Sequence, residues 1–350
     1  TPYPTQDYTI TMGTGLHNNQ HVTIVTITIN PIQYIPAENI IHFAEHITYT
    51  ISYTTTPTAI NPTKTPIDMI VISPAEYTSA IQPLIEHKNS IGITTQHTLD
   101  TDIYTHYPGR DHAEQIKYYI KDMVETHDTK YVLFMGSVLH VPIRYTAIDV
   151  WNEDNIPTDL YYADIYDANG DFCSWDSNHN DLFGEFDWDI GPIDQVDLYP
   201  DVHIGRIPCT TVKQVTDMVN KIIIYETTTK GSPWFEKIIY MAGDTFPNHG
   251  NIEGEFVTSK IIEQRTEFTP IKLWTSQGNY GPFNINLAIT KGAGFISYSG
   301  HGYEQGFGTS KPNVEKRIEY YSPFLIGLFN KNKFPIVFFD ACSTTKLDFD

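Results

Sequence analysis

A cysteine and a histidine near the end of the sequence each follow a run of apolar residues. Cys342 comes shortly after Ile336–Asp340, and His301 comes shortly after Gly294–Ser299. A short apolar run of this kind is typical of a buried strand in a parallel sheet. Chemistry in open α/β sheets collects beyond the carboxyl ends of such strands. A thiol and an imidazole at that edge are the reactive groups of a cysteine hydrolase, and we expect them to be its active site.

The simplest mechanism assigns a role to each group. Cys342 attacks the carbonyl carbon and His301 protonates the leaving amine. The N–H groups of Gly302 and Cys342 stabilise the oxyanion. Glycines on both sides of His301 let the substrate backbone approach closely and permit a positive φ. A third strand, Lys237–Ala242, ends just before Asp244, and a carboxylate there would orient or polarise His301.

The alternative is that these residues belong to the core. A single cysteine after a strand is more often buried packing than a nucleophile. The chain also contains 14 histidines, most of which we expect to be surface or satisfied core groups. The joint placement of a glycine-flanked histidine and a strand-end cysteine is what favours catalysis.

The composition narrows the class of protein. The chain has 350 residues, a hydrophobic fraction of 40% and an aromatic fraction of 13%, which suit a globular protein of two or three domains. No stretch reaches the roughly 18 uninterrupted apolar residues of a membrane span. A net charge of -20 makes nucleic acid an unsuitable partner and suits cationic substrates, calcium or solubility. Three cysteines do not make a disulfide framework, so we expect free thiols.

The N-terminal residues 1–60 are predicted to form a small β-rich domain. Val22–Ile29 has high strand propensity. Apolar and polar residues alternate over Ile47–Tyr53, the pattern of a half-buried strand. The Thr- and Pro-rich segment Thr54–Pro66 is predicted to be a linker.

Residues 61–230 alternate between strand and helix patterns. Strands are expected at Ile67–Ser73 and Tyr131–Met135, and Asp111 with Glu114 resembles a capping box before an amphipathic helix. The order strand, helix, strand predicts a parallel sheet. Residues 150–200 are irregular and acidic, too long for an ordinary connection, and Val212–Tyr225 is expected to be a helix closing this subdomain.

A second α/β subdomain is expected over residues 231–350. Because the chain stops eight residues after Cys342 and a covering helix normally follows such a strand, we expect a second chain or segment to continue after Asp350. The four predicted strands are Lys237–Ala242, Ile271–Trp274, Gly294–Ser299 and Ile336–Asp340.

These motifs resemble the gingipain-type cysteine peptidases, relatives of caspases and legumain. The family's histidine motif is similar to the segment from His301 to Ser310 (HGYEQGFGTS), and its nucleophile motif is similar to Phe338–Cys342 (FFDAC). The resemblance implies a caspase-like fold of two α/β subdomains, and residues 1–60 resemble the β-rich pro-region. Further landmarks are Ile67–Pro74, Tyr131–Gly136 and Pro200–Pro208.

The resemblance also implies site residues. Cys342 matches the nucleophile and His301 the general acid/base, whereas Asp244 falls where gingipains place a glutamate. Asn251 aligns with an aspartate that selects arginine in some members. Glu253 and Glu255 lie close by in the sequence and are candidates to accept a basic side chain, so we expect cleavage after Arg or Lys. The alternative for both glutamates is a solvated first helical turn.

An acidic loop matches the spacing of a calcium site. Oxygen ligands at positions 1, 3 and 5, a carbonyl at 7 and a carboxylate at 12 form such a loop. Asp181 stands where glycine is usual. Calcium here would be structural, and the family is known for bound calcium; the alternative is a hydrated acidic turn. The predicted ligands are Asp176, Asn178, Asn180, Leu182 and Asp187, with Glu185 as a substitute for Asp187.

The sequence therefore predicts a secreted or cell-surface cysteine endopeptidase made as a zymogen, acting on proteins or peptides. The N-terminal region is expected to inhibit the catalytic part or assist its folding. Two alternatives remain open: a transpeptidase or sorting enzyme of the same fold, and a calcium-binding surface protein that keeps the fold without turnover.

Overall fold

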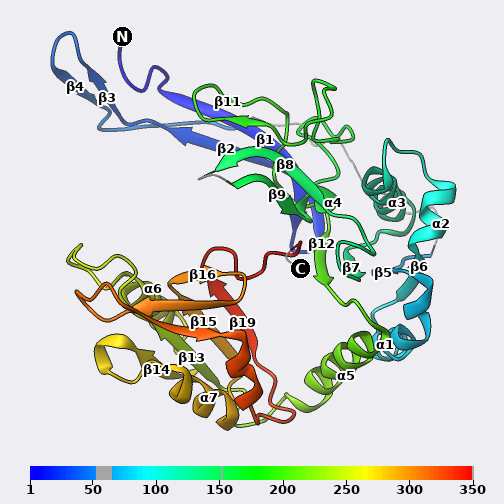
Figure 1. Cartoon of the computed structure of the whole chain (residues 1–350). Coiled ribbons are helices and arrows are strands. Elements are labelled where there is room, and N and C mark those ends of the chain that lie inside the picture. The colour runs from blue at the N-terminus through cyan, green and yellow to red at the C-terminus, as the bar shows by residue number, and fades with distance from the viewer. Residues whose placement is uncertain (53–64, 151–152, 349–350) are drawn as a thin grey trace. The chain divides into compact units, whose positions relative to one another are not determined.

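The computed structural model describes residues 1–52, 65–150 and 153–348 and divides into two compact units, Thr1–Val212 and Lys213–Asp350 (Figure 1). The predicted fold class is confirmed: each unit contains a parallel sheet with helices, and antiparallel strands come first in the chain. The sequence predicts that the second α/β subdomain begins at residue 231. In the structure the second unit begins at Lys213, so it includes nearly all of helix α5 (Val212–Thr228). The Tyr225 ring of α5 lies 6.3 Å from that of Phe235, which is in the second unit.

The N-terminal region consists of two antiparallel hairpins, β1 (Tyr8–His17) with β2 (Gln20–Ile29) and β3 (Ile32–Ile35) with β4 (Ile40–Phe43). The predicted strand at 47–53 is not formed over residues 47–52, whose side chains are exposed. A strand needs a partner to satisfy its backbone, and alternation alone does not provide one. Tyr53 and residues 54–64 of the predicted linker lie outside the described residues.

The β1–β2 hairpin packs against the acidic segment of the first unit. Leu16 donates its backbone N–H to the carbonyl of Pro200 at 2.9 Å, and the backbone N–H of Thr14 donates to the Asp197 carboxylate at 3.0 Å. A Cβ added to Gly13 would lie 2.2 Å from the Tyr199 ring. Glycine is therefore required where the hairpin meets Tyr199.

The sheet of the first unit has four parallel strands in the order β12-β7-β5-β6, as the strand–helix pattern predicts. Helix α3 (His112–His127) begins at Asp111, whose side chain accepts the backbone N–H of Glu114, and its buried face includes Ile116 and Ile120. The strands are β12 (His203–Ile207), β7 (Tyr131–Met135), β5 (Met69–Ser73) and β6 (Thr95–Leu99). The other elements of this unit are η1 (Ala75–Tyr77), α1 (Thr78–Ser90), α2 (Asp100–His106), β8 (Arg144–Val150), β9 (Glu153–Thr158), α4 (Leu160–Ala163), β10 (Phe186–Asp187) and β11 (Gly191–Pro192).

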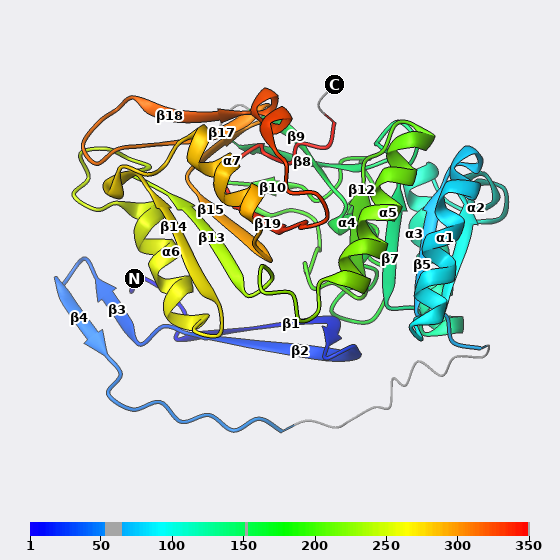
Figure 2. The same cartoon turned by 90° about the horizontal axis from the view of Figure 1, so that it is seen from below.

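The sheet of the second unit also has four parallel strands, in the order β14-β13-β15-β19 (Figure 2). All four predicted strands are present. Ile285 and Ile289 of α7 pack into one core with Ile239 and Met241 of β13. The elements are β13 (Lys237–Ala242), α6 (Glu253–Gln264), β14 (Thr269–Trp274), η2 (Thr275–Gln277), α7 (Pro282–Lys291), β15 (Phe295–Ser299), β16 (His301–Tyr303), β17 (Gly306–Ser310), β18 (Arg317–Tyr321), η3 (Ser322–Gly327) and β19 (Ile336–Asp340).

The pairing register of this sheet aligns the three strands that carry the predicted reactive residues. Ala242 of β13 pairs with Ser299 of β15, and Ser299 pairs with Asp340 of β19. The residues two positions further along these strands are Asp244, His301 and Cys342. The register therefore delivers all three to the carboxyl edge of one sheet. Over its described residues the structure has no helix long and apolar enough to cross a membrane.

Candidate active site

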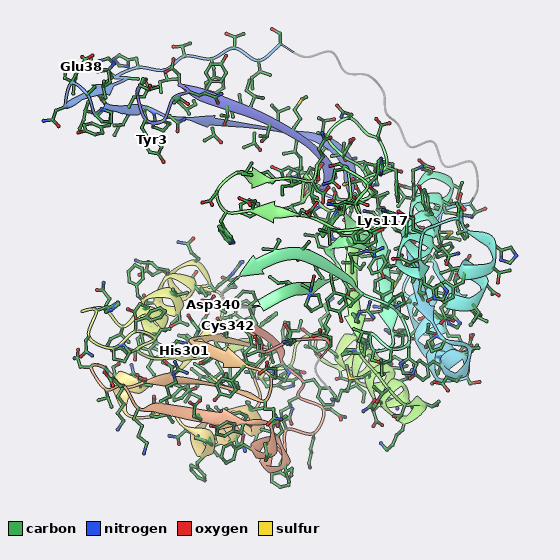
Figure 3. All side chains as sticks on the ribbon, turned by 45° about the horizontal axis from the view of Figure 1, so that its top comes forward. Tyr3, Glu38, Lys117, His301, Asp340 and Cys342 are labelled. Atoms are coloured by element: carbon green, nitrogen blue, oxygen red, sulfur yellow. The ribbon has the colours of Figure 1, made fainter. Side chains whose placement is uncertain are left out.

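His301 and Cys342 lie on adjacent strand ends, as Figure 3 shows together with Asp340. The backbone N–H of Gly300 donates to the carbonyl of Asp340 at 3.2 Å, which extends the pairing of β15 and β19 past the strands themselves. The side chain of Asp340 accepts a hydrogen bond from Ser299 Oγ at 2.9 Å. These bonds hold the segments that carry the imidazole and the thiol side by side.

Gly302 is the point of closest approach between the two segments. A Cβ added there would lie 2.5 Å from Thr344 Cγ2, 2.8 Å from Ala341 Cβ and 3.2 Å from the backbone nitrogen of Cys342. The expectation that glycines here provide positive φ is wrong, because neither Gly300 nor Gly302 is among the positive-φ residues. Close packing is the reason for glycine. The same packing brings together the main chains of Gly302 and Cys342, the two predicted oxyanion donors.

The imidazole of His301 is oriented by a backbone carbonyl. Its Nε2 lies 2.8 Å from the carbonyl oxygen of Thr245, and the Phe246 ring stands edge-on to it with 5.6 Å between centroids. A carbonyl only accepts, so Nε2 carries the hydrogen and Nδ1 is left available to exchange a proton. Tyr298 Oη donates to the carbonyl of His301 at 2.9 Å and so fixes the backbone from which the ring extends.

Asp244 lies beside this arrangement without a direct bond to it. Its main chain is bonded in both directions to Ser310, at 2.9 and 3.1 Å, and its Oδ2 accepts the backbone N–H of Asn313 at 3.0 Å. The buried Oδ1 has no partner among the described residues. Within the described residues, the Asp244 carboxylate makes no hydrogen bond to His301. The residue next to it, Thr245, supplies the contact instead.

Cys342 differs from the other cysteines in its exposure. All three are free thiols, but Cys173 and Cys209 are buried and Cys342 is exposed. An accessible thiol next to an oriented imidazole is the arrangement needed for nucleophilic catalysis.

The three residues predicted to bind the substrate side chain have different environments. Asn251 is exposed. Glu255 is 7% exposed and is not the solvated residue of the alternative interpretation. Its carboxylate accepts the backbone N–H and the hydroxyl of Ser276 at 2.9 and 2.6 Å, which ties α6 to the turn after β14. These bonds hold Glu255 within the protein.

Glu253, the third of these residues, faces the loop that carries Thr245. Its Oε2 accepts the backbone N–H groups of Thr245 at 3.2 Å and Phe246 at 3.3 Å. Burial by itself raises the pKa of Glu253, but hydrogen bonds outweigh it and lower the pKa: first the backbone N–H groups of Glu253, Phe246 and Thr245, and after them the side chain of Asp244.

The acidic loop of the first unit is closed by its own hydrogen bonds. Asp176 is buried, its Oδ2 pairs with the guanidinium of Arg110, and that guanidinium lowers its pKa against the opposing effect of burial. The side-chain amides of Asn178 and Asn180 both donate to Glu185, each at 2.8 Å. The guanidinium of Arg110 therefore already pairs with the carboxylate of Asp176, the first predicted ligand, and calcium binding by this loop stays a prediction.

Two further predicted ligands accept hydrogen bonds within the loop. Asp187 accepts the backbone N–H groups of Asp189 and Ile190 at 2.8 and 2.9 Å, and Asn180 Oδ1 accepts the backbone N–H of Leu182 at 2.9 Å. Among the residues that the structure describes, no three His, Cys, Asp or Glu side chains are grouped so as to hold a metal ion.

Sequence reasoning did not identify Thr245, Phe246 or the position of Glu253 behind them. The contact to His301 is made by a carbonyl oxygen, which every residue has, so no side-chain type marks it. The one available signal is position, since Thr245 follows directly on the strand end that contains Asp244.

A family model and several known proteins are similar to this chain. The model of "Peptidase family C25" matches residues 62–350. Gingipain R2 of Porphyromonas gingivalis is 24% identical over 282 residues, which are 78% of this chain and 32% of that protein. The chain thus spans about a third of the length of this curated relative.

Two solved structures share the fold. The crystal structure of the Arg-specific cysteine proteinase gingipain R (RgpB) has a TM-score of 0.57 at 23% identity, covering 85% of this chain and 58% of that one. The complex of the RgpB pro- and mature domains of Porphyromonas gingivalis has a TM-score of 0.55 at 23% identity, covering 79% and 55%.

Proposed function

The chain belongs to peptidase family C25, and from that premise we propose that it is a cysteine endopeptidase whose nucleophile is Cys342 and whose general acid/base is His301. The observation that supports this most directly is the register of β15 and β19, which sets the two residues at equivalent positions beyond paired strands. The close approach of Gly302 to the backbone of Cys342 brings the segments together.

The reaction would proceed by acyl transfer. The thiol proton of Cys342 passes to Nδ1 of His301, and the sulfur attacks the scissile carbonyl carbon while its electrons move to the oxygen. The N–H groups of Gly302 and Cys342 stabilise that oxyanion. The tetrahedral intermediate collapses, the C–N bond breaks, and His301 returns the proton to the leaving amine. Water then attacks the thioester and gives a proton to His301. The C–S bond breaks, the acid is released, and His301 returns the proton to the sulfur of Cys342.

We further propose cleavage after Arg or Lys. The RgpB structure is named as that of an Arg-specific proteinase, and the net charge of -20 suits a cationic substrate. Asn251 is the exposed candidate for contact with the basic side chain.

Residues 1–60 are proposed to act as a pro-region, so that the protein is made as a zymogen that is secreted or displayed on the cell surface. One solved relative is a complex of pro- and mature domains. The bonds from Thr14 and Leu16 to Asp197 and Pro200 give the N-terminal hairpin a defined attachment within its own unit.

A peptide library incubated with the protein and analysed by mass spectrometry tests this function. Cuts clustered after Arg and Lys, absent with Cys342→Ala, are the expected result. The experiment is run before and after removal of residues 1–60. Supplying a free amine detects ligated products, which would indicate a transpeptidase. No cuts under any condition would contradict the peptidase assignment.

A further inference from the structure

We infer that Glu253 is a positioning residue for His301, acting through the backbone carbonyl of Thr245. The inference rests on the proposed function. It adds a carboxylate that orients the imidazole of His301 indirectly, by holding the loop of Thr245 and Phe246. It also replaces the expectation that Glu253 binds the substrate side chain.

The first step is the contact between the loop and the imidazole. The carbonyl of Thr245 accepts the hydrogen on Nε2 of His301 at 2.8 Å, and the Phe246 ring packs edge-on against the imidazole. Both contacts come from consecutive residues of one loop. Any rotation of the Thr245–Phe246 peptide would therefore change the contacts that orient the imidazole of His301.

The second step is what holds this loop. One carboxylate oxygen of Glu253 accepts the N–H groups of Thr245 and Phe246, at 3.2 and 3.3 Å. Both bonds come from adjacent peptide groups to one carboxylate oxygen, and their lengths lie at the long end of the range for N–H···O bonds. The other side of the loop is fixed by the two main-chain bonds between Asp244 and Ser310. Glu253 is thus the side-chain support of the peptide unit that orients His301.

The third step is what brings Glu253 to the loop. It is the first residue of α6, and the backbone N–H of the next residue, Gly254, donates to the carbonyl of Gly243 at 3.1 Å. A Cβ added at Gly254 would lie 2.6 Å from the carbonyl oxygen of Ser299 and 2.9 Å from that of Gly243. The glycine lets the start of α6 sit directly on the strand ends, which sets Glu253 beside Thr245.

The mechanism gives this support a function in the reaction. When His301 accepts the thiol proton it becomes an imidazolium, and the bond from Nε2 to the Thr245 carbonyl becomes charge-assisted. A carbonyl held in place stabilises the charged ring without reorganisation, as in other preorganised sites. Loss of Glu253 would leave the carbonyl free to turn away at the moment it is needed.

The test compares Glu253→Ala and Glu253→Gln with a substitution at an exposed residue of the same helix, Glu263→Gln; Glu263 pairs with Lys260. On the best-cleaved peptide we expect Glu253→Ala to lower kcat by about tenfold to a hundredfold with KM changed less than about twofold, since misplacement of a catalytic group reduces kcat on this scale. Glu253→Gln keeps one acceptor oxygen and should restore part of the rate. Glu263→Gln should behave as the wild type.

A second readout does not depend on peptide cleavage. The rate at which iodoacetamide alkylates Cys342 is measured by mass spectrometry across pH, because it reports the thiolate formed beside the imidazole. We expect Glu253→Ala to slow alkylation at pH 6 and to move its rise to higher pH, with partial rescue by Glu253→Gln. This readout remains valid if the wild type cleaves no peptide, so failure of the proposed function and failure of this inference are distinguishable.

Two results would overturn the inference. An unchanged alkylation profile in both variants would show that Glu253 does not influence the pair. A raised KM for Arg and Lys peptides with unchanged kcat, or a changed preference for the residue before the cut, would assign Glu253 to substrate recognition. Circular dichroism and the melting temperature of each variant verify that it is folded, and Glu253→Gln is the variant on which the conclusion rests if Glu253→Ala is unfolded.

Discussion

Each of the two parallel sheets presents a cysteine two residues beyond its edge strand. In the first unit Cys209 follows Ile207 of β12, and in the second unit Cys342 follows Asp340 of β19. The neighbouring strands are in matching register, because Ile207 pairs with Met135 as Asp340 pairs with Ser299. The residue opposite Cys209 is then Ser137, whereas the residue opposite Cys342 is His301.

The surroundings of the two thiols differ in a way that explains their expected reactivity. Cys209 is 4% exposed, and burial raises the pKa of its thiol. The imidazole of His140 lies near this end of β12. Its Nδ1 is hydrogen-bonded to Ser137 Oγ at 3.0 Å and its Nε2 to Tyr77 Oη at 3.3 Å, so both ring nitrogens already have partners. Cys342 is exposed and lies next to an imidazole whose Nδ1 is available.

The same lesson comes from the buried thiol of Cys173. Its pKa is raised to about 12, by burial first and by the carboxylate of Asp164 second, and Lys117 lies fully buried among the same residues. The strong pKa shift of Cys173 therefore reports burial and does not by itself indicate a reactive thiol. The proposed chemistry of the second unit depends instead on exposure and on alignment at a strand end, so a strand-end cysteine needs its imidazole neighbour before it indicates a nucleophile.

The largest expected effect separates the two thiols directly. Cys342→Ala should lower peptidase activity by about ten-thousandfold or more, because the nucleophile is lost. Cys209→Ala should leave kcat/KM within about twofold and lower only the melting temperature, since it removes a buried side chain. Activity assays on both variants test this, and comparable losses in the two would contradict the distinction between the sheets.

The second prediction concerns glycines at the two edges. Gly302→Ala should reduce kcat by about tenfold to a hundredfold, because the new methyl group would press on Ala341 and Thr344 and displace Cys342. Gly205→Ala in β12 is the matched control, since its Cβ would meet only Leu133 Cδ1, at 4.0 Å. Equal activity in both variants would show that the spacing between the His301 and Cys342 segments does not matter.

The third prediction uses the buried carboxylate of the first unit. Burial raises the pKa of Asp201 from 3.8 to about 7, so its contribution to folding stability is present below about pH 4 and is lost as the pH rises toward 7. Asp201→Asn removes this dependence. The free energy of unfolding of this variant, relative to that of the wild type, should therefore rise between pH 4 and pH 8 by at most about 4 kcal/mol.

Denaturant titrations at pH 4, 6 and 8 measure this difference. Asparagine retains an oxygen for the backbone N–H groups of Ile165 and Tyr166, which Asp201 accepts at 2.8 and 2.9 Å. A difference between variant and wild type that stays constant over this pH range would show that Asp201 titrates normally in the folded protein.

The smallest expected effect is that of calcium on the acidic loop. Because Arg110 already pairs with Asp176, adding calcium at millimolar concentration should change the melting temperature by less than about 2 °C. Removing the guanidinium in Arg110→Ala frees the carboxylate and is the variant in which calcium would bind. A rise of several degrees in the wild type would confirm the calcium loop that the spacing predicts.

Much of the fold and the site was predictable from the sequence, and the failures share a physical cause. Buried strands such as Lys237–Ala242 and the capping residue Asp111 have local signatures, and both are present as predicted. The alternating segment after β4 failed because strand formation needs a partner that the pattern does not specify. Thr245 was missed because its contact is made by the backbone. The burial of Glu255 was not predicted, because it depends on how α6 meets the turn after β14.

The measurement that tests the central claim most directly is labelling with a peptidyl chloromethyl ketone that carries Arg or Lys at its reactive end. The labelled protein is digested, and each of the three cysteines is quantified by tandem mass spectrometry in the wild type and in His301→Ala. The account predicts rapid labelling of Cys342 alone, and loss of that labelling in the variant. Labelling of Cys209 or Cys173 at a similar rate, or labelling of Cys342 that is equally fast without His301, would contradict it.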